Sequence, residues 1–189
     1  TRYMTWEEIA DLDARGFEVG NHTRAHKNVN EQTPDELCAD IDHIDARCRA
    51  YGIAHPTTFC YPGYRNGPAA VEVLRDRGFA FARRGTDPEF TYNGEGGRGP
   101  AYDPTRHDPL LVPTTGAAGP AYSLDDFKWS VDQATEGQVC VLTYHGVPDL
   151  DHAWVHVDPD VFTTHMRYLQ DNACKVIALR DLECYVPLV

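Results

Sequence analysis

Hydrophobic side chains occur along this chain in two patterns, a spacing of three and four positions and short continuous runs, and segments with the two patterns alternate. Thr33 and Glu36 predict a capping box at the start of residues 33–52, and Gly52 predicts the end of that segment. Within it, apolar side chains recur every three or four positions, as on one buried face of a helix: Leu37, Ile41, Ile44, Cys48 and Tyr51. This segment is therefore expected to be a helix.

The same signals predict the other elements. Capping residues and apolar spacing predict helices over residues 5–16, 67–78, 123–135, 158–172 and 180–186. Short apolar runs predict strands over residues 17–20, 57–62, 79–84, 139–145 and 175–179. Residues 85–122 break this rhythm, because they are rich in glycine and proline and only 110–112 looks like a strand. So long an irregular stretch is more often a functional loop than a linker.

Alternating helices and strands predict an α/β fold, with a parallel sheet that is covered by helices and is either open or closed into a barrel. At 189 residues the chain is long enough for a sizeable core, so a single domain over 1–189 is expected. In such folds functional groups gather at the carboxyl ends of the strands. Polar segments follow three predicted strands, at residues 20–26, 59–64 and 144–149, and we expect them to share one rim.

Composition narrows the range of partners. Acidic residues outnumber basic ones by 29 to 17, for a formal charge of -12. This balance argues against nucleic acid or an anionic membrane as a partner, because few side chains would neutralise phosphates. No apolar run approaches the roughly 18 residues of a membrane span. The six cysteines include no Cys-x-x-Cys pair, so neither a zinc knuckle nor a dense disulfide framework is expected.

The segment "GNHTRAH" (residues 20–26) places His22 and His26 four positions apart, just after a predicted strand. Two neutral imidazoles on a tight loop suit a borderline metal such as zinc, whose catalytic sites use three protein ligands and leave a position for water. Such an ion lowers the pKa of water and polarises a carbonyl. In the alternative interpretation only His22 faces the rim, and His26 caps the next turn.

His145 ends an apolar strand beside Gly146, with Pro148 and Asp149 close behind. A histidine in this place is either a structural residue or, with a metal pair across the same rim, a general acid, because imidazole titrates near neutral pH. The remaining histidines receive no predicted role: His43, His55, His107, His152, His156 and His165.

The segment "FCYPGYRNG" (residues 59–67) combines aromatic residues, a proline and glycines at a strand end. It is either an ordinary turn or a substrate-binding element. In the second case backbone N–H groups, such as that of Gly63, would bind an oxyanion, and Tyr61 and Tyr64 would form walls for a sugar ring.

Together these segments resemble the polysaccharide deacetylase family, the NodB-homology domain of carbohydrate esterases. "HTRAH" (22–26) matches the metal motif of that family, His-Ser/Thr-x-x-His, and "LTYHG" (142–146) matches its Leu-x-x-His segment. Residues 59–64 are similar to its third motif, and the resemblance covers almost the whole chain. It implies a distorted (β/α) barrel and metal-assisted hydrolysis of an N-acetyl group on a sugar, in which the residue matching His145 protonates the leaving amine.

Three features depart from the family pattern. The first motif, Thr-Phe-Asp-Asp-Gly, carries the catalytic base and the third metal ligand, and it would belong upstream of Thr1. The barrel is therefore expected to lack its first strand or two. Cys60 stands where the third motif usually has an arginine that orients the base. The fourth motif, Asp-x-x-Asp-Trp, is only loosely echoed by residues 125–129, so Asp125 and Asp126 receive no role.

The sequence thus predicts a metal-dependent polysaccharide deacetylase, a hydrolase of C–N amide bonds that removes N-acetyl groups from an amino-sugar polymer such as a cell-wall or capsule glycan. Zinc is the expected ion, with cobalt or manganese as alternatives. Two other functions stay open: C–N hydrolysis of a small cyclic amide or ureide, and a degenerate glycan-binding module without activity. The resemblance favours the cell envelope or exterior, whereas unpaired cysteines suit a reducing interior. An exposed barrel edge predicts self-association.

Overall fold

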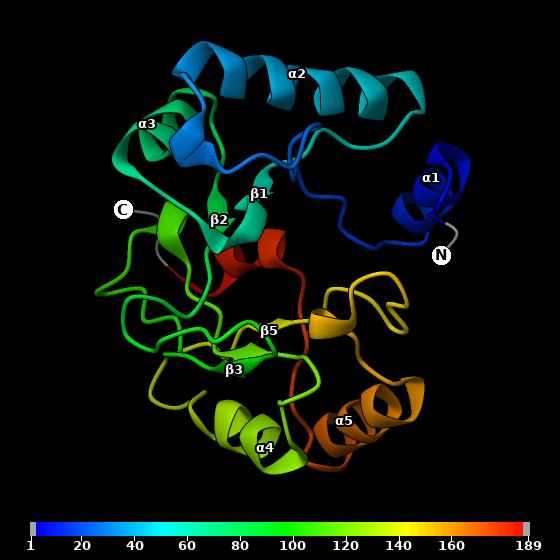
Figure 1. Ribbon diagram of the computed structural model, residues 1–189, viewed down its shortest axis with the longest axis vertical. Helices are drawn as coiled ribbons and strands as arrows, with labels where there is room; N and C mark the ends of the chain where they lie inside the picture. The colour runs from blue at the N-terminus through cyan, green and yellow to red at the C-terminus, as the bar shows by residue number, and fades with distance from the viewer. Residues whose placement is uncertain (1–2, 187–189) are drawn as a thin grey trace. The chain divides into compact units, whose positions relative to one another are not determined.

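The computed structural model describes residues 3–186, and these divide into two compact units. The first unit comprises residues 3–84, 108–112 and 178–186, and the second comprises 85–107 and 113–177. Each unit contains helices and short strands (Figure 1), so the predicted mixed α/β class is confirmed. The expectation of a single domain over 1–189 stays a prediction.

The first unit combines helices with a two-stranded parallel sheet. Strand β1 (Thr58–Cys60) pairs with β2 (Phe81–Arg83), with Thr58 opposite Phe81 and Cys60 opposite Arg83. The carboxyl ends of both strands therefore lie together. The α-helices of this unit are α1 (Trp6–Ala14), α2 (Pro34–Ala50) and α3 (Pro68–Asp76). Single turns of 3-10 helix lie at Val29–Glu31, Pro62–Tyr64 and Pro109–Leu111.

Helix α2 forms for the reasons that its sequence indicates. The Thr33 hydroxyl accepts a hydrogen bond from the Glu36 amide at 3.3 Å, and the Glu36 carboxylate accepts one from the Thr33 amide at 2.8 Å. This reciprocal pair satisfies donors that the first turn leaves without helical partners. The apolar face then packs into the core of the unit, which includes Leu37, Ile41, Phe59, Tyr61, Leu74 and Phe79.

The second unit is built on three short strands and two helices. Strand β4 (Gly116–Ala117) lies between β3 (Gly97–Arg98), which is antiparallel to it, and β5 (Leu142–Thr143), which is parallel to it. The α-helices are α4 (Leu124–Asp132) and α5 (Pro159–Asp171). The core of this unit includes Ala118, Tyr122, Phe127, Val157 and Leu169.

The irregular stretch 85–122 contributes two of these strands, although short apolar runs did not predict them. Thr115 is fully buried, and its hydroxyl donates to the Pro100 carbonyl (3.0 Å) and accepts from the Val141 amide (2.9 Å). At Gly99 a Cβ atom would lie 2.0 Å from the Thr114 carbonyl oxygen. Hydrogen bonds of buried polar groups and the close approach of backbone segments therefore hold this sheet together. Neither interaction requires a regular pattern of hydrophobic residues, so the sequence gives no sign of these strands.

Two of the strands predicted for the first unit are absent, so those predictions were wrong. Residues 17–20 carry no strand, and only the following Asn21 pairs, with Phe59. Residues 109–111 form a 3-10 turn, because Asp108 caps the turn and a proline occupies its first position.

The end of the described chain also differs from its predictions. Residues 175–179 carry no strand, and the predicted helix over 180–186 is a 3-10 helix at Leu179–Cys184. A short apolar run becomes a strand only where a neighbouring backbone offers hydrogen-bond partners, and local sequence does not reveal those partners.

The sheets agree with the predicted barrel in their parallel pairing but not in closure. Parallel pairing, as predicted, holds for β1–β2 and β4–β5. Among residues 3–186 the strands form one two-stranded and one three-stranded sheet, and neither closes into a barrel.

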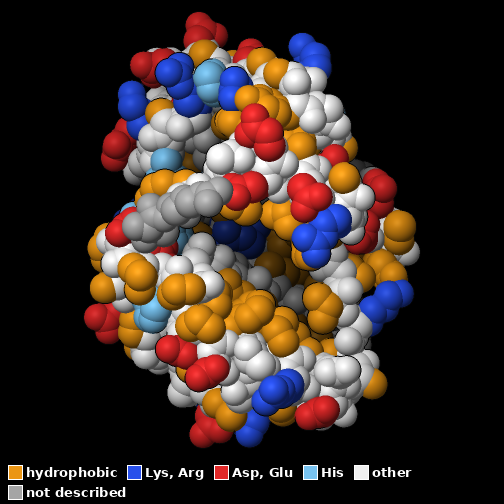
Figure 2. Space-filling model, turned by 90° about the vertical axis from the view of Figure 1, so that its right-hand side faces the viewer, with side chains coloured by type: hydrophobic (Ala, Val, Ile, Leu, Met, Phe, Trp, Pro, Cys, Tyr) orange, Lys and Arg blue, Asp and Glu red, His pale blue; other side chains and the backbone are white. Residues whose placement is uncertain are grey.

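Basic side chains are scattered among acidic and apolar ones on the face that Figure 2 shows. This distribution agrees with the acidic composition. Within residues 3–186, no helix has the length and apolar character needed to cross a membrane.

Candidate functional site

The loop that carries the histidine pair is built around a buried asparagine. The side-chain amide of Asn21 donates to the Ile41 carbonyl (3.2 Å) and to Asp45 Oδ1 (3.1 Å), and its oxygen accepts from the Thr23 amide (3.0 Å). The backbone of Asn21 also pairs with β1. The loop is thereby tied to α2 and β1, and it presents His22 at the end of β1.

His22 is held in one tautomer. Its Nδ1 lies 2.7 Å from the Cys60 carbonyl oxygen, which can only accept, so Nδ1 carries the proton and the lone pair is on Nε2. Burial lowers the pKa of His22, the hydrogen bond to Cys60 opposes this, and the charge of Arg83 adds to the lowering. The imidazole is therefore neutral near pH 7, with Nε2 in the form that binds a metal.

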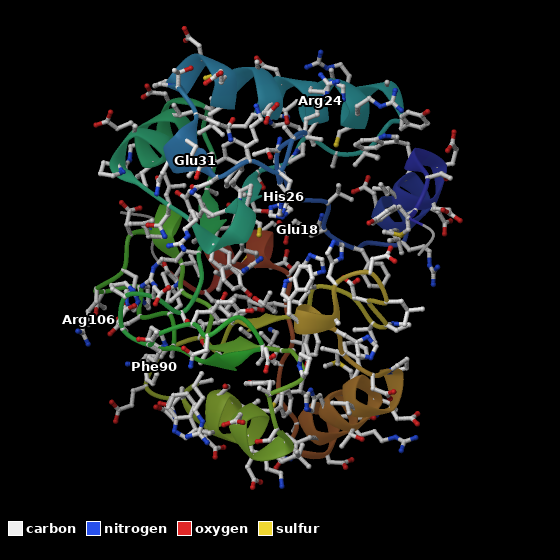
Figure 3. All side chains as sticks on the ribbon, in the orientation of Figure 1. Glu18, Arg24, His26, Glu31, Phe90 and Arg106 are labelled. Atoms are coloured by element: carbon white, nitrogen blue, oxygen red, sulfur yellow. The ribbon has the colours of Figure 1, made fainter. Side chains whose placement is uncertain are left out.

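His26 lies against His22, with ring centroids 4.7 Å apart and ring planes at 77°. Figure 3 labels His26 in the first unit. Its amide donates to the Thr23 hydroxyl at 3.1 Å, and Thr23 and His26 have φ values of 63° and 50°. Such left-handed conformations are strained for residues with a Cβ, and strain of this kind gathers at functional sites. The turn at Val29–Glu31 is capped by Asn28 rather than by His26.

Two adjacent imidazoles fit a borderline divalent ion, because one of them is neutral and oriented through its other ring nitrogen. If such an ion binds here, the pair would provide two of the three protein ligands that a catalytic zinc site uses. Among the described residues, the group that brings three possible ligand atoms within 4.8 Å of one another is a different one: His145, Asp149 and His152.

The structure places an arginine, Arg83, next to Cys60, although position 60 itself is not an arginine. Arg83 is the register partner of Cys60, its guanidinium contacts Cys60 Sγ, and its Cζ lies 5.3 Å from the centroid of the Tyr64 ring. Burial raises the pKa of the Cys60 thiol, although the charge of Arg83 opposes this. Cys60 is therefore a neutral thiol, and the cation at this strand end comes from β2.

The turn after β1 carries the three residues predicted to contact substrate, Tyr61, Gly63 and Tyr64, and they differ in their exposure. Tyr61 is fully buried, its hydroxyl donates to the Leu110 carbonyl (2.9 Å), and its amide donates to the Arg83 carbonyl (3.1 Å). Its ring packs in the core rather than forming a wall. The Tyr64 amide donates to the Tyr61 carbonyl, so neither tyrosine amide is available to an oxyanion. Gly63 is exposed and Tyr64 is half-buried, so these two remain the candidates.

In the second unit two histidine side chains contact the carboxylate of Asp149, and a third contacts the backbone of the same residue. Asp149 Oδ2 lies 2.5 Å from His145 Nδ1, and Asp149 Oδ1 lies 3.0 Å from His152 Nδ1. The amides of Asp151 and His152 also donate to Oδ1, at 3.2 and 2.9 Å. The Asp149 amide in turn donates to His156 Nδ1 at 3.2 Å. The Asp149 side chain is only 8% exposed, whereas that of His145 is 47% exposed.

Hydrogen bonds keep Asp149 ionised. Burial alone would raise the pKa of its carboxyl, but the hydrogen bonds from His145 and His152 outweigh burial and lower the pKa to about 2. Gly146 makes this arrangement possible, because a Cβ there would lie 2.7 Å from the Asp149 Cβ. Asp149 thus orients His145 through Nδ1 and leaves its Nε2 available to a reactant.

The same three side chains are also a possible metal site. Their shortest separations, 2.5 and 3.0 Å, are hydrogen-bond distances, with Nδ1 protons between each imidazole and the carboxylate. An ion held by these atoms would displace those protons. Hydrogen bonding to an orienting carboxylate is therefore the better description of this group.

No motif in the sequence predicts a role for His152 or His156, and Asp149 stands out only as a neighbour of His145. The spacing His-x-x-x-Asp-x-x-His in residues 145–152 is the available signal. Such a spacing has no fixed geometry in a loop, so it does not by itself predict a site. The position of Arg83 next to Cys60 depends on strand register, which the sequence does not display.

Comparison with known families confirms the resemblance. Residues 2–82 match the model of the family described as polysaccharide deacetylase. This matching segment contains the His22–His26 loop and the turn at 61–64. No curated protein has a significantly similar sequence.

Two solved structures are similar to the chain at low identity. A protein from Mycobacterium smegmatis, provisionally described as a polysaccharide deacetylase, is 14% identical, with a TM-score of 0.58 over 90% of this chain and 61% of that one. The deacetylase PplD from Streptococcus pyogenes, in complex with acetate, is 15% identical, with a TM-score of 0.49 over 67% of this chain and 50% of that one. The first supports the fold, and the second is too distant to support an argument. The chain spans half to about three fifths of these proteins.

Proposed function

We propose that the chain carries the catalytic surface of a metal-dependent deacetylase that removes N-acetyl groups from an amino-sugar polymer. The observation that supports this most is the His22–His26 pair, in which His22 is neutral and oriented by the Cys60 carbonyl, within sequence that matches the polysaccharide deacetylase family. A distorted barrel of the NodB-homology type is the architecture that we propose for the complete protein, with parallel pairing in β1–β2 and β4–β5 as support.

His22 and His26 are the proposed metal-binding residues, with zinc as the first choice and cobalt or manganese as alternatives. A bound ion of this kind supplies Lewis acidity toward an amide carbonyl and makes water acidic enough to react near neutral pH. His22 contributes a fixed Nε2 direction, because its Nδ1 is bonded to the backbone of β1. Gly63 and Tyr64 are the proposed contacts to the substrate at this strand end.

His145 is the proposed general acid. Its side chain is exposed and its Nδ1 is bonded to Asp149, so Nε2 can deliver a proton to the departing amine nitrogen. Asp149 fixes the orientation of the imidazole through its hydrogen bond to Nδ1, and is therefore a positioning residue. Amide cleavage needs this proton, because an unprotonated amine is a poor leaving group.

One observation favours a second candidate, a glycan-binding module without activity. Within residues 3–186 no third His, Cys, Asp or Glu ligand atom joins His22 and His26 at the short separations found around Asp149. Acetate release separates the two candidates. The metal-depleted chain should release no acetate from an oligomer of β-linked N-acetylglucosamine, and added zinc, cobalt or manganese should restore release.

Binding of the oligomer without acetate release under any of these metals would contradict the enzyme and support the binding module. Hydrolysis of a small cyclic amide or ureide, with no release from the glycan, would identify the same site as a small-molecule C–N hydrolase.

A further inference from the structure

The loop between β5 and α5 (Figure 1) is closed on itself, and it carries an exposed tryptophan, Trp154. Gly146 pairs with His156 as an isolated bridge, and the Val157 amide donates to the Gly146 carbonyl at 3.3 Å. The hydrogen bond from the Asp149 amide to His156 closes the loop a second time. Residues 145–157 therefore form a tied loop, and the side chains on it have defined positions.

Aromatic rings run through this loop from His145 to Trp154. The His145 and His152 centroids are 5.1 Å apart at 66°, and the His152 and Trp154 centroids are 5.3 Å apart at 84°. In an edge-on contact of the second kind, at least one face of the indole is left uncovered by the imidazole. Trp154 is 55% exposed, and Leu150 on the same loop is 73% exposed.

A single exposed apolar residue is common and needs no explanation. Trp154 differs because its ring is in contact with His152, which in turn contacts both the proposed acid and the carboxylate that orients it. The exposed indole therefore lies one imidazole away from His145. A rigid aromatic face at this distance suits a flat apolar surface of a ligand whose reacting bond reaches His145.

The charge of the segment that carries Trp154 restricts the ligand further. The segment from 149 to 160 contains no lysine or arginine and is rich in aspartate: Asp149, Asp151, Asp158 and Asp160. Asp151, Asp158 and Asp160 are exposed. Carboxylates accept hydrogen bonds from sugar hydroxyls and attract ammonium groups, but they repel uronate or sulfate groups.

We propose that Trp154 is a stacking platform for a sugar ring of a neutral or cationic amino-sugar oligomer, one unit away from the residue that reacts at His145. The position of the reacting bond at His145 rests on the proposed function, whereas the stacking of a sugar ring on Trp154 does not depend on it. The C–H face of a pyranose ring covers the indole, while its hydroxyl and amine groups point toward the aspartates. Anionic glycans are excluded by charge.

Binding of an N-acetylglucosamine hexamer to the whole chain, measured by calorimetry, tests the platform without relying on turnover. Trp154→Ala should weaken binding roughly two- to tenfold, the range for an aromatic contact of this kind. Trp154→Phe should restore most of the affinity, and Tyr185→Ala, which removes another exposed aromatic side chain in the first unit, should leave it unchanged. A uronate-containing oligomer of the same length should bind more weakly than the hexamer.

Intrinsic fluorescence provides a second measurement that does not depend on the Ala variant folding. The hexamer should change the emission of the wild type, and Trp154→Phe should abolish that change while still binding. Equal affinity of the wild type and a folded Trp154→Ala protein, no binding by the wild type, or equal binding of the anionic oligomer would overturn the platform. Loss of binding in Trp154→Ala without acetate release by the wild type would keep the platform and remove the proposed enzyme activity.

Discussion

At the residue scale, His22 and His145 share one arrangement. In each imidazole Nδ1 is hydrogen-bonded to another group of the protein, so Nε2 faces a metal ion or a reactant in the proposed roles. In His22 the partner is the neutral Cys60 carbonyl, and in His145 it is the Asp149 carboxylate. A neutral partner suits a metal ligand, which must stay unprotonated, whereas the carboxylate partner of His145 orients an exposed imidazole that is proposed to deliver a proton. The two histidines are therefore expected to respond differently to substitution.

His22→Ala and His26→Ala should each lower zinc affinity by at least about tenfold, because each removes one of few ligands. Metal content after dialysis, measured by mass spectrometry, checks this expectation. His43→Ala is the control, since His43 is exposed on α2 outside the loop. Equal metal content in the wild type and both loop variants would rule out the metal site.

In a protein that also carries the Asp-Asp-Gly motif of the family, His145→Ala should retain the metal and the fold while turnover falls by roughly two to four orders of magnitude, the usual contribution of a positioned general acid. Metal content, melting temperature and acetate release on this one variant separate three roles. A metal ligand would lose occupancy and activity together, and a structural histidine would lose stability alone. Normal turnover in a folded His145→Ala protein would contradict the acid role.

At the scale of elements, the loop 145–157 depends on its central carboxylate. Asp149 accepts hydrogen bonds from two imidazoles and two backbone amides, and Gly146 provides the space for it. The donors belong to residues 145, 151 and 152, so removing one charge affects the whole loop. The element therefore behaves as a unit, and its stability should follow the ionisation of Asp149.

Asp149→Asn should lower the free energy of unfolding by about 1–3 kcal/mol at pH 7, the cost of losing hydrogen bonds to a buried charged group. The pKa of Asp149 is lowered from 3.8 to about 2, so its contribution is complete above pH 3.8 and disappears as the pH falls through 2. Thermal unfolding from pH 2 to 7 should show the two proteins converging only at the acid end. Asp160→Asn, an exposed carboxylate in the first turn of α5, is the control. A constant difference at every pH would contradict this role of the charge.

At the scale of the whole molecule, stability should depend on a buried histidine that has no part in the proposed chemistry. His165 on α5 is 1% exposed, stacks on Phe127 with centroids 4.0 Å apart, and has its Nδ1 2.9 Å from the Tyr144 hydroxyl. Its Nε2 is buried without a hydrogen-bond partner among the described residues. Burial lowers the pKa of His165 below its ordinary value of 6.5.

At pH values between the lowered pKa of His165 and 6.5, the imidazole is protonated in the unfolded chain but not in the folded protein. The contribution of His165 to the free energy of unfolding should therefore be complete above pH 6.5 and fall as the pH drops below it. Urea unfolding at pH 5 to 8, in the presence of a chelator, should show this decline in the wild type. His165→Gln should be less stable at pH 8, because it loses the stacked ring, but should decline less steeply toward pH 5. Parallel pH profiles would show that His165 does not control acid sensitivity.

Part of the site could be predicted from sequence because its signals are local. The loop at residues 20–26 carries its two histidines only four positions apart, and this short spacing brings their rings together, whereas its attachment to β1 is a contact between distant segments. The gathering of His152 and His156 around Asp149 depends on how the loop folds back on Gly146. The burial of Tyr61, which removed it as a sugar contact, depends on Leu110, far along the chain.

The sequence by itself determined the similarity of residues 2–82 to the polysaccharide deacetylase model, the capped helices and the close spacing of the two loop histidines, because capping boxes, helical periods and short motifs act between residues a few positions apart. Only the tertiary structure decided which apolar runs became strands, which tyrosine entered the core, and that Arg83 would supply the cation beside Cys60. These outcomes depend on hydrogen bonds and packing between segments far apart in the chain. The free energy of such contacts belongs to the pair of segments and cannot be assigned to either segment alone.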